Sequence, residues 1–241
     1  MPKDEVFKEV GTGSADFKFG ANVVAVFDDM VTRSVPFYIE IQRMISEMVQ
    51  DFGVSGTNVY DLGCSTGTTF LNIDKILPKD ITFIGIDNSQ EMLDKCEKNL
   101  REAGVSRNLE LKFADLNKGI HLENASIVIM CLTLQFVRPL YREKLIKNIY
   151  EQLNTNGCLI VVEKVLGEYS LFNRLFIKYY YDMKRRHNYS EIEISQKREA
   201  LENVLIPYKL EENKELLFNT GFRYVDTFFK WYNFSGIIAV K

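Results

Sequence analysis

The sequence predicts an α/β fold in which seven strands form a mostly parallel sheet covered by helices. Short apolar segments typical of strands alternate with helical segments from residue 58 to residue 163. Strands separated by helices run parallel, because each helix carries the chain back across a face of the sheet. After Gly221 and Phe222, two further β-rich segments follow each other closely. This spacing indicates an antiparallel strand pair near the C-terminus.

Each element of the alternating part follows from its local pattern. The strands are predicted at Asn58–Leu62, Ile81–Asp87, Leu109–Ala114, Ala125–Cys131 and Cys158–Glu163. The helices are predicted at Thr68–Ile76, Ser89–Arg101 and Pro139–Gln152. Pro78 stops the first of these helices, and Gly104 lies just past the end of the second. The two final strands are predicted at Tyr224–Lys230 and Tyr232–Val240.

Further helices are expected before and within this alternation. The first ~20 residues are polar and contain glycines, so we expect a loose arm there. Ser34 is predicted to cap a helix that has Pro36 in its first turn and ends at Gly53 and Gly56. Three helical segments precede the final strands, at Leu171–Arg186, Ser190–Val204 and Glu211–Asn219. We therefore predict one domain, residues 1–241, with a helical insertion at about residues 168–210.

The composition limits the function classes. Thirty basic against 33 acidic side chains give a net charge of −3, so no global basic field favours stable nucleic-acid binding. Four scattered cysteines without a C-x-x-C pair are typical of reduced thiols, and we expect a cytoplasmic protein. No apolar segment approaches the length that spans a membrane, and the N-terminus carries no apolar signal region. His121 and His187 are isolated in the sequence, so no metal site is expected.

The segment from Asp61 to Gly67 is the most informative for function. It joins a strand to a helix through glycines, as in the cofactor loop of S-adenosyl-L-methionine (SAM) methyltransferases. Gly63 lets the backbone approach a ligand closely, and Asp61 can accept a hydrogen bond from a ligand amine. Asp87 ends the second strand, 24 residues after Gly63, where an acidic side chain can accept from ribose hydroxyls. Asp115, just past the third strand, is a natural partner for an adenine amino group.

Other interpretations of this loop remain open from the residues alone. NAD binding is the obvious rival, but Gly63-x-x-x-Gly67 lacks the full G-x-G-x-x-G pattern that holds a pyrophosphate. An Asp-x-Gly sequence is often only a turn, and Asp87 could simply cap the next helix. Because the acidic residues follow in order at strand ends, we predict a SAM site in a Rossmann-like class I methyltransferase fold.

Two segments of the insertion carry candidate functional residues. Ser190 and Glu193 form a capping box, which places Arg198 about two turns into the helix that follows. An arginine on a helix is usually solvated surface, so composition alone gives Arg198 no role. The run from Lys178 to His187 mixes basic and aromatic residues, which can bind RNA. The acidic total charge favours instead an amphipathic helix whose tyrosines pack on this chain or on a second subunit.

The chain resembles the carboxy-S-adenosyl-L-methionine synthase family nearly from end to end. The most specific motifs are Arg33-Ser34-Val35-Pro36-x-Tyr38 and the segment Tyr189–Arg198. The remaining motifs are Val59–Ser65, Ile86–Ser89, Glu123–Ser126, Leu132–Phe136, Leu201–Val204 and the segment from Asn233 to Lys241. Members of the family make carboxy-SAM from SAM and prephenate and release phenylpyruvate. A companion carboxymethyltransferase then modifies a wobble uridine of tRNA, and the family is dimeric.

The resemblance implies a set of ligand contacts. The residues expected to line the SAM-derived ligand are Tyr38, Gly63, Cys64, Ser65, Asp87, Asn88, Asp115, Leu116, Cys131 and Arg198. Arg198 is expected to hold the added carboxylate, because a guanidinium can donate two parallel hydrogen bonds to it. The family mechanism also implies that prephenate breakdown releases carbon dioxide, which the deprotonated methyl carbon of SAM captures. We expect the departing prephenate hydroxyl to supply the base, because no histidine is an evident candidate.

One position departs from the family, and two other functions remain possible. Cys131 stands where the family usually has asparagine, and a thiol cannot replace an amide as a hydrogen-bonding group. We expect the contact at this position to come from the backbone carbonyl. Cys64 is expected to fit the turn rather than act as a nucleophile.

Two rival functions are kept beside this one. The first is a SAM-dependent methyltransferase acting on tRNA or a small molecule, and the second is a non-catalytic SAM-binding or RNA-binding partner.

Overall fold

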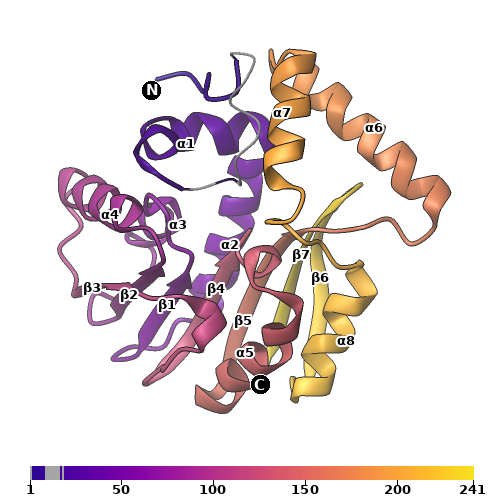
Figure 1. Ribbon diagram of the computed structural model, residues 1–241. Coiled ribbons are helices and arrows are strands. Elements are labelled where there is room, and N and C mark those ends of the chain that lie inside the picture. Colours follow the sequence, from indigo (N-terminus) through magenta and orange to yellow (C-terminus); the bar gives the residue numbers. More distant parts are fainter. Residues whose placement is uncertain (1, 9–16, 18) are drawn as a thin grey trace.

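The structure is a computed structural model that describes residues 2–8, 17 and 19–241 (Figure 1). Its strands are β1 (Asn58–Leu62), β2 (Thr82–Asp87), β3 (Leu109–Phe113), β4 (Ala125–Cys131), β5 (Leu153–Lys164), β6 (Tyr224–Trp231) and β7 (Phe234–Val240). Its first helices are α1 (Ala21–Ser34), α2 (Tyr38–Phe52), α3 (Thr68–Ile73), α4 (Gln90–Glu102) and α5 (Pro139–Gln152). The later helices are α6 (Ser170–Arg186), α7 (Glu191–Leu201) and α8 (Leu210–Thr220), and short 3₁₀ helices lie at η1 (Leu116–Lys118) and η2 (Leu134–Phe136).

The seven strands form one sheet in the order β3-β2-β1-β4-β5-β7-β6. Strands β1 to β5 pair in parallel, whereas β7 pairs antiparallel with both β5 and β6. The predicted α/β fold with an antiparallel C-terminal pair is therefore confirmed. The strand order reverses between β1 and β4, and the crevice beyond the carboxyl ends at such a reversal is where α/β sheets bind ligands.

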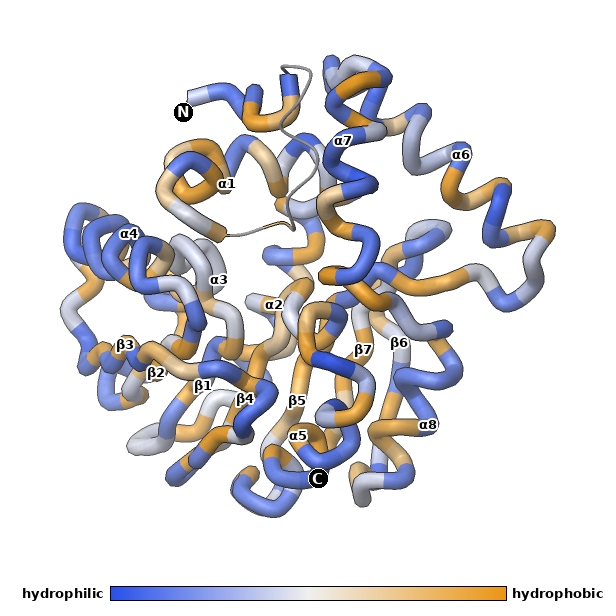
Figure 2. Tube along the Cα trace, viewed as in Figure 1, coloured by the Kyte–Doolittle hydropathy of each residue, from blue (hydrophilic) through white to orange (hydrophobic). Residues whose placement is uncertain are grey.

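Alternate residues of each central strand enter opposite layers of the core. One face of the sheet contributes Val59, Ile127 and Ile160, which pack with buried residues of α2, α3 and α4. The other face contributes Tyr60 and Val128, which pack with buried residues of α5 and α8. Figure 2 shows hydrophobic residues along β4 and β5 and mainly hydrophilic residues on the outward-facing α4. The result is a sheet between two helical layers, with α1, α6 and α7 gathered above the carboxyl ends of the strands (Figure 1).

The N-terminal region differs from the sequence prediction. Ser34 does not cap a helix; it is the last residue of α1, and its hydroxyl donates to the Met30 carbonyl at 2.5 Å. Helix α2 begins only at Tyr38, after Phe37 adopts a left-handed conformation with φ of 53°. Val35 and Pro36 thus separate two helices, because proline disfavours a helical conformation in the residue before it.

The described part of the N-terminal arm is also not loose. Asp4 is 2% exposed and accepts a 2.7 Å hydrogen bond from the Tyr189 hydroxyl, while Phe7 is buried. The rest of the arm, at residues 1, 9–16 and 18, lies outside the described residues. Smaller differences are the earlier end of α3, at Ile73, and the longer β5, which begins at Leu153.

Candidate functional site

A cavity of about 730 Å³ opens beyond the carboxyl ends of β1, β2 and β4. Its volume lies in the upper half of the roughly 300–1,000 Å³ range of small-molecule sites, which leaves room for more than one small ligand. All ten residues that the sequence assigned to the ligand line this cavity: Tyr38, Gly63, Cys64, Ser65, Asp87, Asn88, Asp115, Leu116, Cys131 and Arg198. The fold therefore brings together residues that lie up to 160 positions apart in the sequence.

The glycine loop between β1 and α3 is held in a left-handed conformation. Gly63 and Gly67 have φ of 80° and 84°, and Ser65 has φ of 47°. A positive φ, as at Ser65, is rare for a residue with a side chain, and such residues cluster at ligand-binding sites. The Gly63 amide donates to the Ile86 carbonyl at 2.7 Å, so the loop is fixed to β2 as well as to its own strand. A Cβ at Gly63 would collide with the Thr133 side chain, which explains the glycine.

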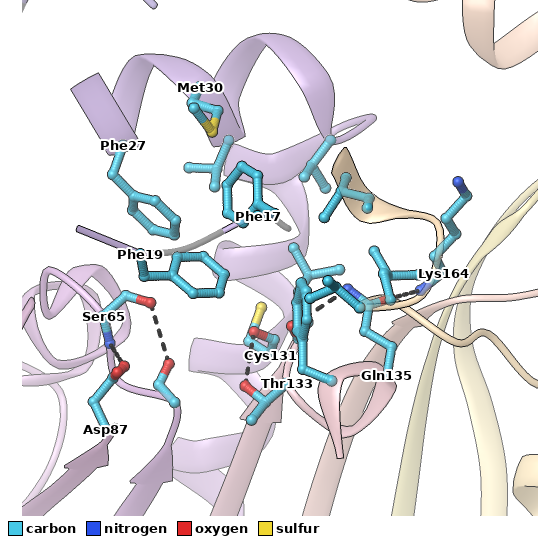
Figure 3. Close-up of a pocket in the computed structure, with 18 of the residues that line it drawn as sticks. Phe17, Phe19, Phe27, Met30, Ser65, Asp87, Cys131, Thr133, Gln135 and Lys164 are labelled. Atoms are coloured by element: carbon cyan, nitrogen blue, oxygen red, sulfur yellow. Dashed lines mark hydrogen bonds between the residues drawn. The ribbon is translucent and has the colours of Figure 1, made fainter. Parts of the chain in front are cut away.

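Asp87 connects this loop to the next helix. Its Oδ2 accepts from the Ser65 amide at 3.0 Å (Figure 3). Its Oδ1 accepts from the Ser89 amide, also at 3.0 Å. Ser89, rather than Asp87, caps α4, because its hydroxyl accepts from the Met92 amide. Burial raises the pKa of Asp87, and the backbone hydrogen bonds oppose that effect. A carboxylate has about four lone-pair positions, so Asp87 retains capacity for ribose hydroxyls.

Asp61 provides an unsatisfied acceptor at the centre of the cavity. The side chain is 2% exposed, and its Oδ1 has no hydrogen-bond partner among the described residues. Burial raises its pKa to about 7, a hydrogen bond from Thr69 opposes the shift and the nearby Asp87 charge adds to it. A buried acceptor without a partner is costly unless a ligand supplies the donor. The ammonium group of a SAM methionine moiety would be such a donor.

Asn88, Asp115 and Leu116 line the part of the cavity beyond β2 and β3, where the sequence predicts the adenine contact. The Asp115 Oδ1 accepts from the Asn117 backbone amide at 3.0 Å and from the Asn117 side-chain amide at 2.7 Å. These bonds fix the carboxylate at the start of η1. Asn88 is exposed, immediately beyond the end of β2. An apolar side chain and an oriented carboxylate beside each other suit an adenine ring with its amino group.

Burial disfavours the thiolate form of the two cysteines at the site, Cys64 and Cys131. A neighbouring thiol, Cys96, and burial raise the pKa of Cys64 well above its ordinary value. Burial likewise raises the pKa of Cys131, whose Sγ lies 3.7 Å from Nε2 of Gln42. The carbonyl of Cys131 accepts a long hydrogen bond of 3.4 Å from the Thr133 hydroxyl, and its second lone pair gives it capacity for a ligand.

Aromatic side chains from the N-terminal region cover the cavity. Phe17, Phe19 and Phe27 line it together with Met30 of α1 (Figure 3). The ring of Phe19 makes an edge contact with the ring of Phe136, with centroids 5.4 Å apart, and the Phe19 carbonyl accepts from the Ser89 hydroxyl at 2.8 Å. The sequence prediction missed this cover, because it treated the region as a loose arm.

The far end of the cavity is cationic. Arg198 reaches it from α7 with a side chain that is 61% exposed and 3.7 Å from Glu199. Lys164, Lys184 and Lys197 also line this end, and the sequence prediction missed all three. Two signals were available, since Lys197 adjoins Arg198 and Lys184 lies in the basic and aromatic run of α6. That run otherwise serves packing: Tyr180 is buried, and Arg185 pairs with Asp182 and Glu191.

Comparison with known proteins establishes the family. The chain is 58% identical to a carboxy-S-adenosyl-L-methionine synthase of Methylococcus capsulatus over the full length of both proteins. It is 43% identical to the corresponding protein of Desulfotalea psychrophila, over 99% of this chain and 97% of that protein. The chain belongs to the carboxy-S-adenosyl-L-methionine synthase family. A methyltransferase-domain family model also matches residues 59–157.

Solved structures place this family member in the class I methyltransferase fold. A SAM-dependent methyltransferase of Aquifex aeolicus superposes with a TM-score of 0.61 at 16% identity, over 92% of this chain and 99% of that chain. An O-methyltransferase family protein of Burkholderia thailandensis gives 0.65 at 13% identity, over 92% and 60%. The structure of the synthase family member thus has the methyltransferase fold. Among the described residues, no helix is long and apolar enough to cross a membrane, and no group of three potential metal ligands occurs.

Proposed function

We propose that this protein converts SAM and prephenate to carboxy-SAM, phenylpyruvate and water. Full-length similarity to carboxy-SAM synthases supports the reaction. The observation that carries the proposal is the cavity itself, which joins a SAM-type loop at one end to an arginine and three lysines at the other. Ordinary methyl transfer does not require cations there, whereas a reaction between SAM and an anionic carboxylic acid does.

The residues of the glycine loop end fit SAM. Asp61 would accept from the methionine ammonium through its unpartnered oxygen, and Asp87 would accept from the ribose hydroxyls. Asp115 and Leu116 would hold the adenine ring. Tyr38, Cys64, Ser65, Asn88 and Cys131 complete the set of wall residues that we assign to the SAM-derived ligand. The chain positions its ligands largely through backbone and carboxylate groups that the loop already orients.

The chemistry balances without a further reactant. Loss of hydroxide and carbon dioxide converts prephenate to phenylpyruvate, and the electron pair of the broken C–C bond aromatises the ring. Hydroxide removes a proton from the SAM methyl group and becomes water, and the resulting carbanion bonds to carbon dioxide. No described histidine lines the cavity, which is consistent with a base supplied by the substrate. The protein would contribute positioning of the two substrates and exclusion of water.

Arg198 is the residue that we assign to the new carboxylate. Arg198 lines the cavity, and its ion pair within the described residues is a 3.7 Å contact with Glu199. A bidentate contact to the carboxylate of carboxy-SAM would distinguish this product from SAM. The exposed position of the side chain leaves it free to turn toward the cavity.

The wider setting is part of the same proposal. We propose that the enzyme is a cytoplasmic homodimer and that a separate carboxymethyltransferase uses its product on the wobble uridine of tRNA. The four cysteines are free thiols, which supports a reducing compartment. The apolar side chains of Leu171 and Phe172 on α6 are 56% and 47% exposed, which supports a subunit contact there. Light scattering at micromolar concentration tests the dimer.

The direct test is to incubate the purified protein with SAM, with and without prephenate, and to identify products by mass spectrometry. We expect SAM to gain the mass of carbon dioxide only when prephenate is present, together with formation of phenylpyruvate. Unchanged SAM under both conditions would contradict the proposal. Appearance of demethylated SAM and a methylated acceptor would favour a methyltransferase instead.

A further inference from the structure

Three lysines from different elements converge at the cationic end of the cavity. Lys164 ends β5, Lys184 lies near the end of α6 and Lys197 lies on α7. Lys164 and Lys184 both approach the ring of Tyr180, with Nζ atoms 5.1 Å and 4.9 Å from its centroid. Lys184 and Lys197 both approach the ring of Tyr189, at 5.9 Å and 5.7 Å. Two tyrosines therefore hold three ammonium groups in one cluster.

Among the described residues, Asp4 is the only carboxylate that pairs with a lysine of this cluster. Lys184 and Lys197 are 5% and 6% exposed, and neither Lys164 nor Lys184 forms an ion pair within the described part of the chain. The nearest carboxylate to Lys197 is Asp4, whose Oδ2 lies 3.8 Å away and already accepts from the Tyr189 hydroxyl. Within the same part of the chain, the Lys197 Nζ has no hydrogen-bond partner.

Such a cluster is unfavourable in the ligand-free protein. Burial lowers the pKa of Lys164 and of Lys197 to about 8, and burial with the two neighbouring lysines lowers that of Lys184 further from its ordinary value. Removing charged groups from water without partners costs several kcal/mol per ion. Cation–π contacts with the tyrosines offset only about 0.5–2 kcal/mol each. A bound anion would supply the missing charge and hydrogen-bond acceptors.

The position of the cluster fits the second substrate rather than SAM. In the close-up, Lys164 and Gln135 lie on one side of the cavity, while Ser65 and Asp87 of the nucleoside end lie on the other (Figure 3). Glu163, which precedes Lys164, accepts from the Leu134 and Gln135 amides at 2.8 Å each. Those bonds fix the end of β5, and the Lys164 amide in turn donates to the Gln135 side chain at 3.0 Å. The lysine at this point is thus presented by a rigid strand end.

From this arrangement we propose that Lys164, Lys184 and Lys197 form the subsite that binds the two carboxylates of prephenate. The inference rests on the proposed function, because it deepens the assignment of the second substrate. One carboxylate of prephenate must stay on the product and the other must leave as carbon dioxide. A ligand with two carboxylates matches a cluster of at least two cations. With three lysines available, Arg198 remains free for the new carboxylate of SAM.

Neutral variants of the three lysines provide the test. Lys164→Gln, Lys184→Gln and Lys197→Gln keep most of the side-chain volume and remove the charge. Lys178→Gln is the matched control, because Lys178 is an exposed lysine of α6 outside the cavity lining. For each variant, the KM for prephenate, the Kd for SAM and the melting temperature are measured.

We expect the KM for prephenate to rise about tenfold or more in at least two of the three variants, since each loses a charge-assisted hydrogen bond. The Kd for SAM should stay close to that of the wild-type protein and of Lys178→Gln, and the melting temperature should not fall, because each variant loses an unfavourable buried charge. A KM within about threefold of wild type in all three variants would overturn the subsite. A loss of SAM binding in step with the rise in KM would also overturn it, because the lysines would then act on the whole site.

Calorimetry separates this inference from the proposed function. Prephenate is titrated into SAM-loaded wild-type protein and into the same variants, so that binding is measured without relying on turnover. Binding that is present in the wild type and weakened in the lysine variants supports the subsite even if no carboxy-SAM forms. An active wild-type enzyme whose prephenate affinity is unchanged in the variants refutes the subsite alone. No binding to the SAM-loaded wild type refutes the subsite directly.

Discussion

The Asp87 carboxylate holds the Ser65 amide at 3.0 Å and thereby fixes the left-handed turn of the glycine loop. The same side chain holds the Ser89 amide at the start of α4, so one residue connects the glycine loop to the next helix. Because Ser65 is strained and Asp87 is buried, we propose that this contact has both a structural and a ligand-binding consequence.

Asp87→Asn should weaken SAM binding more than it weakens the fold. The asparagine amide keeps one acceptor oxygen. Its NH₂ group is only a donor, so it can accept neither the hydrogen bond from a backbone N–H nor one from a ribose hydroxyl. We expect the Kd for SAM to rise about tenfold or more, measured by calorimetry. Asp94→Asn on the exposed face of α4 is the control and should leave the Kd unchanged. An unchanged Kd in Asp87→Asn would contradict the assignment of the ribose contact.

Arg198→Ala should separate binding of SAM from its carboxylation. The guanidinium has no assigned contact with SAM itself, so the Kd for SAM should stay within about twofold of wild type. The kcat/KM for carboxy-SAM formation should fall about a hundredfold, because a bidentate contact to the product carboxylate is lost. Arg174→Ala, at an exposed arginine of α6 away from the cavity, is the control. Undiminished synthesis by Arg198→Ala would remove the assigned role.

Asp61 should make the ligand-free protein less stable as pH rises. Burial raises its pKa from 3.8 to about 7, so the folded state binds the proton more tightly than the unfolded state. The free energy of unfolding should therefore fall between those two pH values, by at most about 1.4 kcal/mol per pH unit. Urea unfolding of Asp61→Asn between pH 3.8 and pH 7 should not show this fall in the free energy of unfolding. Parallel pH profiles of the two proteins would contradict it.

Lys197 should have the opposite effect at higher pH. Its pKa is lowered from 10.5 to about 8, so the unfolded state binds more protons between these values. The free energy of unfolding contributed by this group should rise with pH there, again by at most about 1.4 kcal/mol per unit. Urea unfolding measures this effect in the wild type and in Lys197→Met. Between pH 8 and pH 10.5, the free energy of unfolding of the wild type should rise relative to that of Lys197→Met. A constant difference would indicate an ordinary lysine pKa.

Arg107 should be important for stability and unimportant for chemistry. Its Nε donates to Asp74 at 2.7 Å, its guanidinium lies 4.2 Å from the Phe83 ring centroid, and the side chain is fully buried. Arg107→Met leaves the Asp74 charge without its buried partner, which costs about 3–5 kcal/mol. Arg101→Met breaks an exposed pair with Glu97 and should cost under about 1 kcal/mol. Equal losses in chemical denaturation would contradict this distinction.

Much of the site could be predicted because it depends on local backbone requirements. Gly63 and Gly67 occupy left-handed positions, and Asp87 ends a strand, so their roles follow from short segments of sequence. Arg198 could be assigned only through family resemblance, since an exposed helical arginine has no distinguishing local pattern.

The remaining features depend on tertiary packing. Lys184 becomes a cavity residue only because α6 and α7 close over the strand ends, and periodicity along α6 does not specify that contact. Ser34 and Pro36 resemble a helix start, yet they mark the junction between α1 and α2. The aromatic cover was missed for the same reason, because Phe19 contacts Phe136 across more than a hundred residues of sequence.

We propose that a carboxylate passes from prephenate to the SAM methyl carbon within this one cavity. It is tested most directly with prephenate labelled with ¹³C in the carboxylate attached to the ring, incubated with SAM and enzyme and followed by mass spectrometry. We predict that the label appears in carboxy-SAM while phenylpyruvate is unlabelled. Labelled phenylpyruvate, or carboxy-SAM that acquires its carboxylate from dissolved bicarbonate, would contradict the account.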